Sequence, residues 1–207
     1  MKIRIAIFVR GGRVVEVRFG LFAAGAEGDG EHLVRPFAER PWLEIVLVDC
    51  NRADAPVLQR VAPYHVPALV TDRAQLAQPQ FVTMLQEQYH IHFIVLAGFL
   101  LRVPDTLVEA YHRRMVNLHP ALLPKFGGKG MYGHHVHEAV KTAGETETGM
   151  TLHWVSNEID GGDIIVQHRT AIEPDDTPED IARKEHELEM RYLPTDIEQV
   201  IVSCQWA

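Results

Sequence analysis

An amide and an imidazole stand two residues apart in the segment Asn117-Leu118-His119-Pro120. Residues i and i+2 of a strand project from the same face, so we expect these two side chains to lie together. Pro120 favours extended backbone at His119 and ends the strand there. Because ligands bind outside the carboxyl ends of parallel strands, the pair is a catalytic candidate. The alternative is a histidine that simply packs near the end of a strand.

A carboxylate that complements this pair occurs later, in the segment Ser156-Asn157-Glu158-Ile159-Asp160-Gly161-Gly162. Asp160 precedes two glycines and is either a turn residue or an acid that acts on His119. An adjacent carboxylate raises the pKa of a histidine, so we expect Asp160 to favour the imidazolium form of His119. Between the two segments, residues 121–133 contain four glycines, which indicate a loop with unusual backbone geometry.

Three further histidines, His134, His135 and His137, raise the question of a metal site. Their spacing lacks the H-E-x-x-H pattern of zinc enzymes. A helix from about His134 to Thr142 would spread the three side chains over different faces. We therefore expect surface or helix-cap roles and no metal.

The elements that position these groups are short apolar runs alternating with helical patterns. Strands are expected at Val17 to Ala23, Leu43 to Val48, Ala68 to Thr71, His92 to Ala97 and Met115 to His119. Helices are expected at Glu31 to Glu39, Ala55 to Ala62, Gln80 to Tyr89 and Pro104 to Tyr111. This alternation predicts an α/β fold with a Rossmann-like, mostly parallel sheet and helices on both faces.

The second half of the chain has a different pattern. Met150 to Val155 and Asp163 to Arg169 alternate around a turn-rich segment and predict a β-hairpin or meander. Thr177, followed by Pro-Glu-Asp, is a typical helix N-cap. We expect a terminal helix from there to about Tyr192 and a further one to Val202.

The first sixteen residues form a leading β segment. Ile3 to Val9 and Val14 to Phe19 flank Arg10-Gly11-Gly12-Arg13, a pattern typical of a hairpin with a Gly-Gly turn. One interpretation is an extra edge strand of little function. The other is that Arg10 and Arg13 hold a phosphate.

Composition limits the class of protein. The chain has 207 residues, with 46% hydrophobic and 23% charged, which predicts one globular domain over residues 1–207. The net charge of −8 argues against a nucleic-acid platform. Only two cysteines are present and no apolar stretch suits a membrane helix. Arg4 interrupts the first apolar run and no small-residue cleavage site follows, so we expect no secretory signal. We expect a cytoplasmic protein.

Three motifs together carry a family resemblance: VLAGFLLRVP (95–104), NLHPALLPKFGGKGMYG (117–133) and IDGGDII (159–165). With them, the sequence from Val17 to about Ile201 resembles the phosphoribosylglycinamide formyltransferases of the folate-dependent formyltransferase superfamily. The resemblance implies formyl transfer from the co-substrate 10-formyltetrahydrofolate to the primary amine of glycinamide ribonucleotide, in de novo purine biosynthesis. It implies small-molecule partners only, no metal, and a monomer or homodimer.

The resemblance also implies roles for individual residues. The catalytic residues are Asn117, His119 and Asp160. Folate binding falls to Leu100, Leu101, Arg102 and Val103, to Asn117, and to Ser156, Asn157, Glu158, Ile159 and Asp160. Binding of the ribonucleotide falls to Glu27, Gly28, Asp29, His186 and Glu189.

The sequence departs from the family at the loop that binds the substrate phosphate. The family has G-x-G-S/T-N after its first strand, whereas the aligned stretch here is Gly25-Ala26-Glu27-Gly28-Asp29-Gly30. Two carboxylates facing a phosphate would repel it. Two alternatives therefore stand beside the main interpretation: a formyltransferase with another amine acceptor, such as an amino sugar nucleotide, and a catalytically weakened folate-binding homologue.

Overall fold

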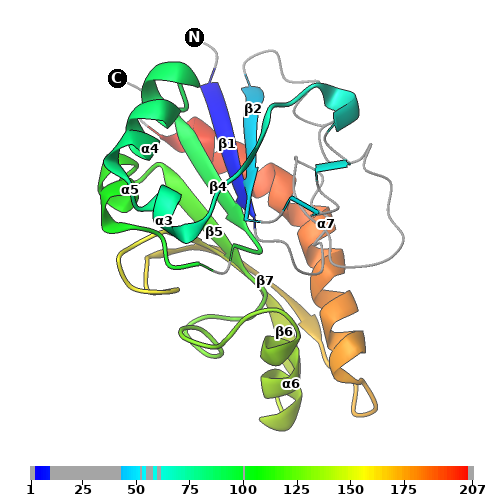
Figure 1. Cartoon of the computed structure of the whole chain (residues 1–207). Helices are drawn as coiled ribbons and strands as arrows, with labels where there is room; N and C mark the ends of the chain where they lie inside the picture. Colours follow the sequence, from blue (N-terminus) through cyan, green and yellow to red (C-terminus); the bar gives the residue numbers. More distant parts are fainter. Residues whose placement is uncertain are drawn as a thin grey trace. The chain divides into compact units, whose positions relative to one another are not determined.

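The computed structural model of the chain describes residues 3–9, 43–51, 53–54, 58–59, 62–99 and 101–204 (Figure 1). The chain groups into two compact units, Met1–Val116 and Asn117–Ala207. A single domain over residues 1–207 stays a prediction. The strand Val17 to Ala23 and the helix Glu31 to Glu39 lie outside the described residues, as does most of the helix Ala55 to Ala62.

The first unit is built on parallel strands. They are β1 (Ile3–Val9), β2 (Leu43–Cys50), β3 (Ala68–Val70) and β4 (Phe93–Ala97), in the spatial order β3-β2-β1-β4. Each neighbouring pair in this order is parallel. The strands predicted around Leu43, Ala68 and His92 are confirmed to within two residues at each end.

The leading segment is the main correction to the sequence interpretation. β1 pairs with β2 on one side and with β4 on the other, so Ile3–Val9 is an interior strand. The edge-strand interpretation was wrong. A Gly-Gly pair after an apolar run fits a hairpin turn as well as it fits a loop after an interior strand, so the pattern alone does not distinguish them. A parallel strand instead finds its partners far along the chain, across a crossover connection.

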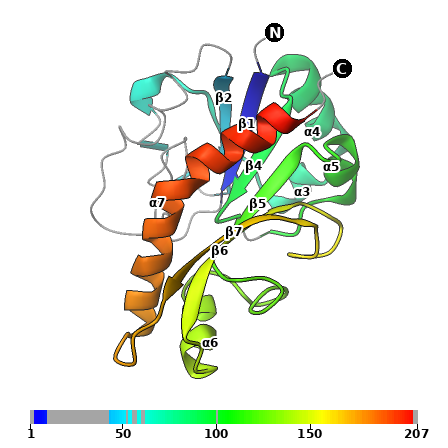
Figure 2. The same cartoon turned by 180° about the vertical axis from the view of Figure 1, so that it is seen from behind.

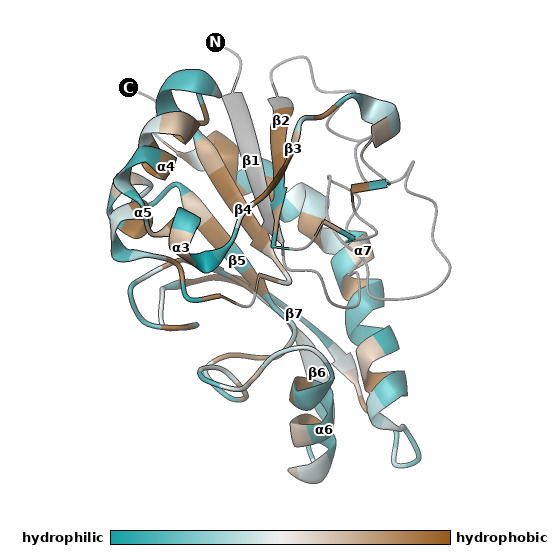
Figure 3. Cartoon of the chain, in the orientation of Figure 1, coloured by the Kyte–Doolittle hydropathy of each residue, from teal (hydrophilic) through white to brown (hydrophobic). Residues whose placement is uncertain are grey.

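Short helical segments complete the first unit: η1 (Ala62–Tyr64), α3 (Arg73–Leu76), α4 (Pro79–Thr83), the π-helical η2 (Met84–Gln88) and α5 (Asp105–Ala110). The helix expected over Gln80 to Tyr89 is thus divided between α4 and η2. α3 was not expected; a capping box between Asp72 and Gln75 starts it. The strands β2 and β4 bury their apolar side chains, with Leu47 and Phe93 fully enclosed, and β4 is hydrophobic along most of its length (Figure 3).

β5 (Met115–His119) begins at the end of the first unit and its last three residues open the second. The second unit continues with α6 (His134–Thr142), β6 (Glu147–Trp154), β7 (Ile164–Ala171) and α7 (Pro178–Ser203). β6 and β7 pair antiparallel, which confirms the predicted hairpin. Ala121, Val136, Val140 and Ile181 form a buried apolar cluster between the loop after β5, α6 and α7.

The terminal helix is longer than expected. Thr177 and Asp180 form the predicted capping box at its start. Two helices were expected around Pro194, but α7 is a single helix of 26 residues with Pro194 inside it. It changes direction part way along (Figure 2), as helices do at a proline. The helix continues because Leu193, Ile197 and Ile201 are fully buried on both sides of the proline.

Candidate functional site

The three predicted catalytic side chains lie together in the second unit. Asn117 and His119 project from β5, and Asp160 comes from the loop between β6 and β7. The Nδ1 atom of His119 lies 3.5 Å from Oδ2 of Asp160. The Nδ2 atom of Asn117 lies 3.4 Å from Oδ1 of the same carboxylate. The i, i+2 spacing on β5 therefore places the amide and the imidazole against one acid.

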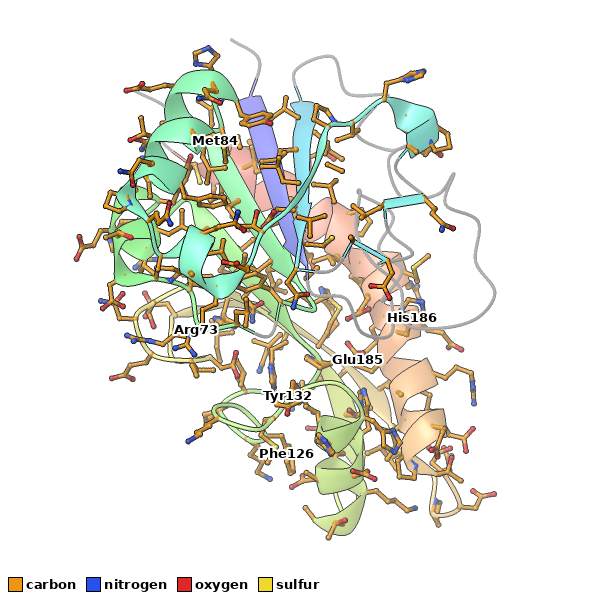
Figure 4. The ribbon with its side chains drawn as sticks, in the orientation of Figure 1. Arg73, Met84, Phe126, Tyr132, Glu185 and His186 are labelled. Carbon is orange, nitrogen blue, oxygen red and sulfur yellow. The ribbon has the colours of Figure 1, made fainter. Side chains whose placement is uncertain are left out.

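The tautomer of His119 follows from its partner. Its Nε2 atom lies 2.7 Å from the backbone carbonyl oxygen of Phe126, which only accepts hydrogen bonds. Nε2 therefore carries the hydrogen, and in the neutral ring Nδ1 holds the lone pair. Phe126, in the loop before α6 (Figure 4), has a φ of 57°, a backbone conformation uncommon outside glycine.

The resting charge of His119 differs from the expectation. Burial lowers the pKa of His119, and the Asp160 charge and the Phe126 carbonyl raise it only in part. The carboxylate thus acts in the predicted direction, but the loss of solvation outweighs it, because the residue is only 3% exposed. His119 is neutral near pH 7, with Nδ1 free to accept a proton.

Asp160 is held by the glycine-rich loop that follows β5. The backbone N–H of Gly128 donates to Oδ2 of Asp160 at 2.8 Å. Gly128 has a φ of 89°, which a residue with a side chain rarely adopts. A Cβ atom at Gly127 would overlap the end of the Leu123 side chain, which would have to move, and would come into ordinary contact with Asp160. The positive φ of Gly128 is therefore what directs this backbone N–H at the carboxylate.

Asp160 is ionised at neutral pH. Burial acts to raise its pKa, but contacts with His153, His119 and the N–H of Gly128 lower it below the ordinary value for aspartate. The residue has a φ of 55°, which aspartate tolerates better than most side chains. A backbone hydrogen bond from Gly161 to Glu158 closes the turn around it. Asp160 is thus both the turn residue and the acid.

His153 belongs to the site and was missed. Its Nε2 atom lies 3.0 Å from Nδ2 of Asn117 and 3.6 Å from Oδ1 of Asp160. Its Nδ1 atom lies 2.9 Å from the carbonyl oxygen of Trp154, so Nδ1 carries the hydrogen and Nε2 accepts from Asn117. The signal in the sequence is a histidine near the end of the predicted strand Met150 to Val155, directly before the Asp160 loop.

The amide of Asn117 is oriented by this contact. One Nδ2 hydrogen goes to His153, and the other points to Asp160 over the long distance of 3.4 Å. A hydrogen bond of that length is weak, so this second N–H is the one that a reacting oxygen can recruit.

The remaining predicted folate residues divide between the two units. Leu101, Arg102 and Val103 belong to the first unit, where Arg102 forms an ion pair with Asp105; Leu100 lies outside the described residues. In the second unit, the hydroxyl of Ser156 accepts from the N–H of Glu158, and Ile159 is exposed. Their contact with folate stays a prediction.

The predicted ribonucleotide residues lie partly within the structure. His186 and Glu189 share one face of α7, with His186 Nδ1 3.1 Å from Glu189 Oε2. Glu189 is buried rather than solvated. Glu27, Gly28 and Asp29 lie outside the described residues.

The three histidines of α6 have different environments. His134 and His135 reach Glu138 on the surface, as expected. His137 was expected at the surface but is buried, and its Nδ1 atom has no hydrogen-bond partner among the residues that the structure describes. Burial, aided by His134 and His119, lowers the pKa of His137 to about 4. Within the described residues, no group of His, Cys, Asp and Glu side chains is arranged to hold a metal ion.

Comparison with known proteins places this site in a family. The pattern of the family described as "Formyl transferase" matches residues 18–197. A phosphoribosylglycinamide formyltransferase of Bacillus subtilis is 32% identical over 189 residues, which are 89% of this chain and 94% of that protein. A chloroplastic enzyme of the same name from Arabidopsis thaliana is 37% identical over 155 residues, 70% of this chain but 53% of its own length.

The fold agrees with the sequence comparisons. The crystal structure of a phosphoribosylglycinamide formyltransferase from Anaplasma phagocytophilum matches with a TM-score of 0.79 and 25% identity, over 100% of this chain and 90% of that one. The predicted Rossmann-like α/β fold is thereby confirmed. Among the described helices, none is long and apolar enough to cross a membrane. The chain belongs to the formyl transferase family.

Proposed function

We propose that this protein transfers the formyl group of 10-formyltetrahydrofolate to the primary amine of glycinamide ribonucleotide, a step of purine biosynthesis. The observation that carries the proposal is the arrangement of His119, whose Nε2 is fixed by a carbonyl and whose Nδ1 faces Asp160. Relatives named for this reaction support the choice of substrates, because they align over most of the chain.

The first chemical task is to remove a proton from the attacking amine. Neutral His119 accepts that proton at Nδ1, directly or through a water molecule. Protonation turns a lone pair facing a carboxylate into an ion pair with Asp160, so the acid stabilises the product of the proton transfer. His119 then returns the proton to the folate nitrogen as its bond to the formyl carbon breaks. One proton thus moves from the amine to the folate.

The second task is to stabilise the negative charge that develops on the formyl oxygen. The Asn117 N–H that makes only a long contact with Asp160 is the donor for that oxygen. His153 holds the other N–H and keeps the amide from rotating away. The positive charge of His119, present once the ring has taken the proton, adds electrostatic stabilisation of that oxygen.

Turnover with purified protein tests the proposal. We expect 10-formyltetrahydrofolate to lose its formyl group when glycinamide ribonucleotide is added, with a formylated ribonucleotide as product. Turnover only with an amino sugar nucleotide would show that this compound, and not glycinamide ribonucleotide, is the acceptor. If calorimetry shows folate binding but neither acceptor is turned over, the protein is a folate-binding protein and the proposed enzymatic activity is refuted.

The position of β1 bears on the phosphate of the ribonucleotide. The family resemblance implies a phosphate loop at Gly25–Gly30, which follows the strand expected at Val17 to Ala23. β1 ends at Val9, so the segment that directly follows the first strand begins with Arg10-Gly11-Gly12-Arg13. This supports the alternative in which the two arginines, rather than the Glu27 region, meet the phosphate.

Two variants separate these placements. We expect Arg10→Ala with Arg13→Ala to raise the KM for the ribonucleotide about tenfold or more, because charge-assisted hydrogen bonds are lost. Glu27→Gly with Asp29→Asn should leave that KM unchanged. If the second variant tightens binding instead, its carboxylates face the phosphate and the loop lies at Gly25–Gly30.

A further inference from the structure

Two polar side chains of the β6-β7 hairpin hold the backbone of Leu123, in the loop that follows β5. The hydroxyl of Thr151 on β6 accepts from the Leu123 N–H at 3.1 Å. The side-chain amide of Gln167 on β7 donates to the Leu123 carbonyl oxygen at 2.9 Å. Thr151 and Gln167 lie directly opposite each other in the antiparallel register, and the Gln167 amide also donates to the Thr151 hydroxyl at 2.9 Å. Both backbone groups of Leu123 are therefore fixed by one cross-strand pair.

The donors of this pair are fully used. Thr151 donates its hydroxyl hydrogen to the Ala121 carbonyl oxygen at 2.6 Å and accepts from Leu123 and Gln167. The two N–H groups of the Gln167 amide go to Leu123 and to Thr151. Thr151 is completely buried, where losing one of these bonds leaves polar groups without partners. The pair therefore allows one path for residues 121–123.

Packing leaves the next part of the loop free to shift. A pocket of about 280 Å³ lies against residues 122–126, with Val140 and Arg169 among its other lining residues. Because side chains do not fill this space, van der Waals contacts on that side do not hold the loop in one position. The hydrogen bonds to the hairpin supply the constraint that packing does not.

The same loop carries the carbonyl group that sets the tautomer of His119. Phe126, labelled in Figure 4, follows Leu123 by three residues and places its oxygen 2.7 Å from Nε2 of His119. If this oxygen moves away, the neutral ring is free to carry its hydrogen on Nδ1 and to donate it to Asp160, which lies 3.5 Å away. Nδ1 then has no lone pair for the proton of the amine. The position of the loop thus decides whether His119 is a base.

We propose that Thr151 and Gln167 are positioning residues, which hold the loop after β5 so that the Phe126 carbonyl keeps the hydrogen of His119 on Nε2. The inference rests on the proposed function, in which Nδ1 of His119 accepts a proton. Both side chains bind backbone groups of residues 121–123, so they act on His119 through the chain that connects it to Phe126.

Gln167→Met tests this role, because methionine keeps the length of the side chain without its N–H groups. We expect kcat to fall about tenfold, with the KM of each substrate within about twofold, because part of the protein holds the wrong tautomer. Nitrogen–proton correlation spectra of histidine-labelled protein should show His119 changing from the Nε2–H towards the Nδ1–H form, with His119→Gln used to assign its signal. Arg169→Met is the matched control, since Arg169 lies on the same strand and pairs with Glu147 at the surface. Its rate and tautomer should equal those of wild type.

Thr151→Val and Thr151→Ser provide a second, independent pair. Valine keeps the shape of threonine without the hydroxyl and should reproduce the loss of kcat and the change of tautomer. Serine keeps the hydroxyl and should retain the wild-type rate and tautomer.

The tautomer separates positioning from a purely structural role, because lower melting temperatures accompany both. A wild-type kcat in Gln167→Met would overturn the inference, as would a lower kcat with His119 still in the Nε2–H form. If Gln167→Met does not fold, the same two outcomes in Thr151→Val decide. Absence of wild-type turnover would refute the proposed function instead, while the spectra would still report whether the pair sets the tautomer.

Discussion

At the scale of single residues, the proposed mechanism requires Asp160 to stabilise the positive charge on His119. We expect Asp160→Asn to lower kcat about 100-fold or more, because the imidazolium loses its counter-ion. Folding should be unaffected, since asparagine adopts the positive φ as readily as aspartate. Steady-state kinetics with a thermal melt measure both effects. Asp175→Asn, an exposed carboxylate of the same unit, is the control; a kcat near that of wild type would remove Asp160 from the mechanism.

We expect His153 to act through Asn117 and not directly on the substrates, because its Nε2 atom contacts the Asn117 amide. His153→Phe keeps a ring in the buried strand but removes the acceptor for the Asn117 amide. We expect kcat to fall about three- to tenfold, the effect of losing one neutral hydrogen bond in the transition state. His153→Gln, whose side-chain oxygen can accept from the amide, should recover part of the loss. Equal rates for the Phe and Gln variants would contradict the assignment.

Part of the site was predictable because two residues on one strand face require no knowledge of packing. Asn117 and His119 are such a pair, whereas the residues alone left Asp160 as either a turn residue or an acid, and the family resemblance pointed to the acid. The protonation state of His119 was not predictable, because it depends on burial, which outweighs the neighbouring charge. The role of Phe126 was equally hidden, since any residue supplies a carbonyl and only its φ directs it at the ring.

At the scale of elements, α7 is tied to β7 by a buried polar contact. His168 on β7 lies 2.8 Å from the Asp196 carboxylate, and its ring stacks on Tyr192 with a centroid distance of 3.9 Å. Burial raises the pKa of Asp196, and the histidine only partly offsets this. The contact therefore satisfies a carboxylate that packing alone would disfavour.

Removing the histidine should destabilise the second unit. We expect His168→Phe, which keeps the stacked ring, to lower the free energy of unfolding by about 2 kcal/mol, because Asp196 is left buried without its partner. Adding Asp196→Leu should restore most of the loss. Denaturant unfolding of the single and double variants measures this, with Arg169→Gln on the same strand as an exposed control. A double variant no more stable than His168→Phe would show that the loss does not come from the unpaired Asp196 carboxylate.

Sequence patterns identified most elements but not their continuity. Strands β2 to β5 and helix α6 follow local periodicity. α7 does not, because Pro194 signals an end that the burial of Leu193 and Ile197 overrides. Local propensity is a weak guide wherever tertiary packing is strong.

At the scale of the whole molecule, a buried carboxyl in the first unit makes stability depend on pH. Asp49 is 1% exposed near the end of β2. Burial raises its pKa to about 7, and a hydrogen bond from Thr71 lowers the pKa only in part. The folded state thus binds this proton more tightly than the unfolded chain does. Its contribution to stability is complete below about pH 4 and is lost as the pH rises to about 7.

Asp49→Asn should remove this dependence. The amide still accepts from Thr71 but carries no charge, so we expect the variant to exceed wild type in unfolding free energy at pH 8, by up to about 4 kcal/mol. At pH 4 the two should be equal. Denaturant titrations at both pH values provide the measurement, with the exposed Glu87→Gln as control. If the difference in unfolding free energy between variant and wild type is the same at pH 4 and pH 8, the pKa of Asp49 is not raised by folding.

The interior position of β1 has a practical consequence for anyone who trims this protein. The family pattern begins at residue 18, and a chain cut there would lose residues 3–9. β2 and β4 would then each lose β1 as their partner strand. The backbone N–H and C=O groups that β1 had satisfied would be left without hydrogen bonds. Open strand edges of this kind recruit strands from other copies, so the shortened chain should precipitate rather than yield a smaller enzyme.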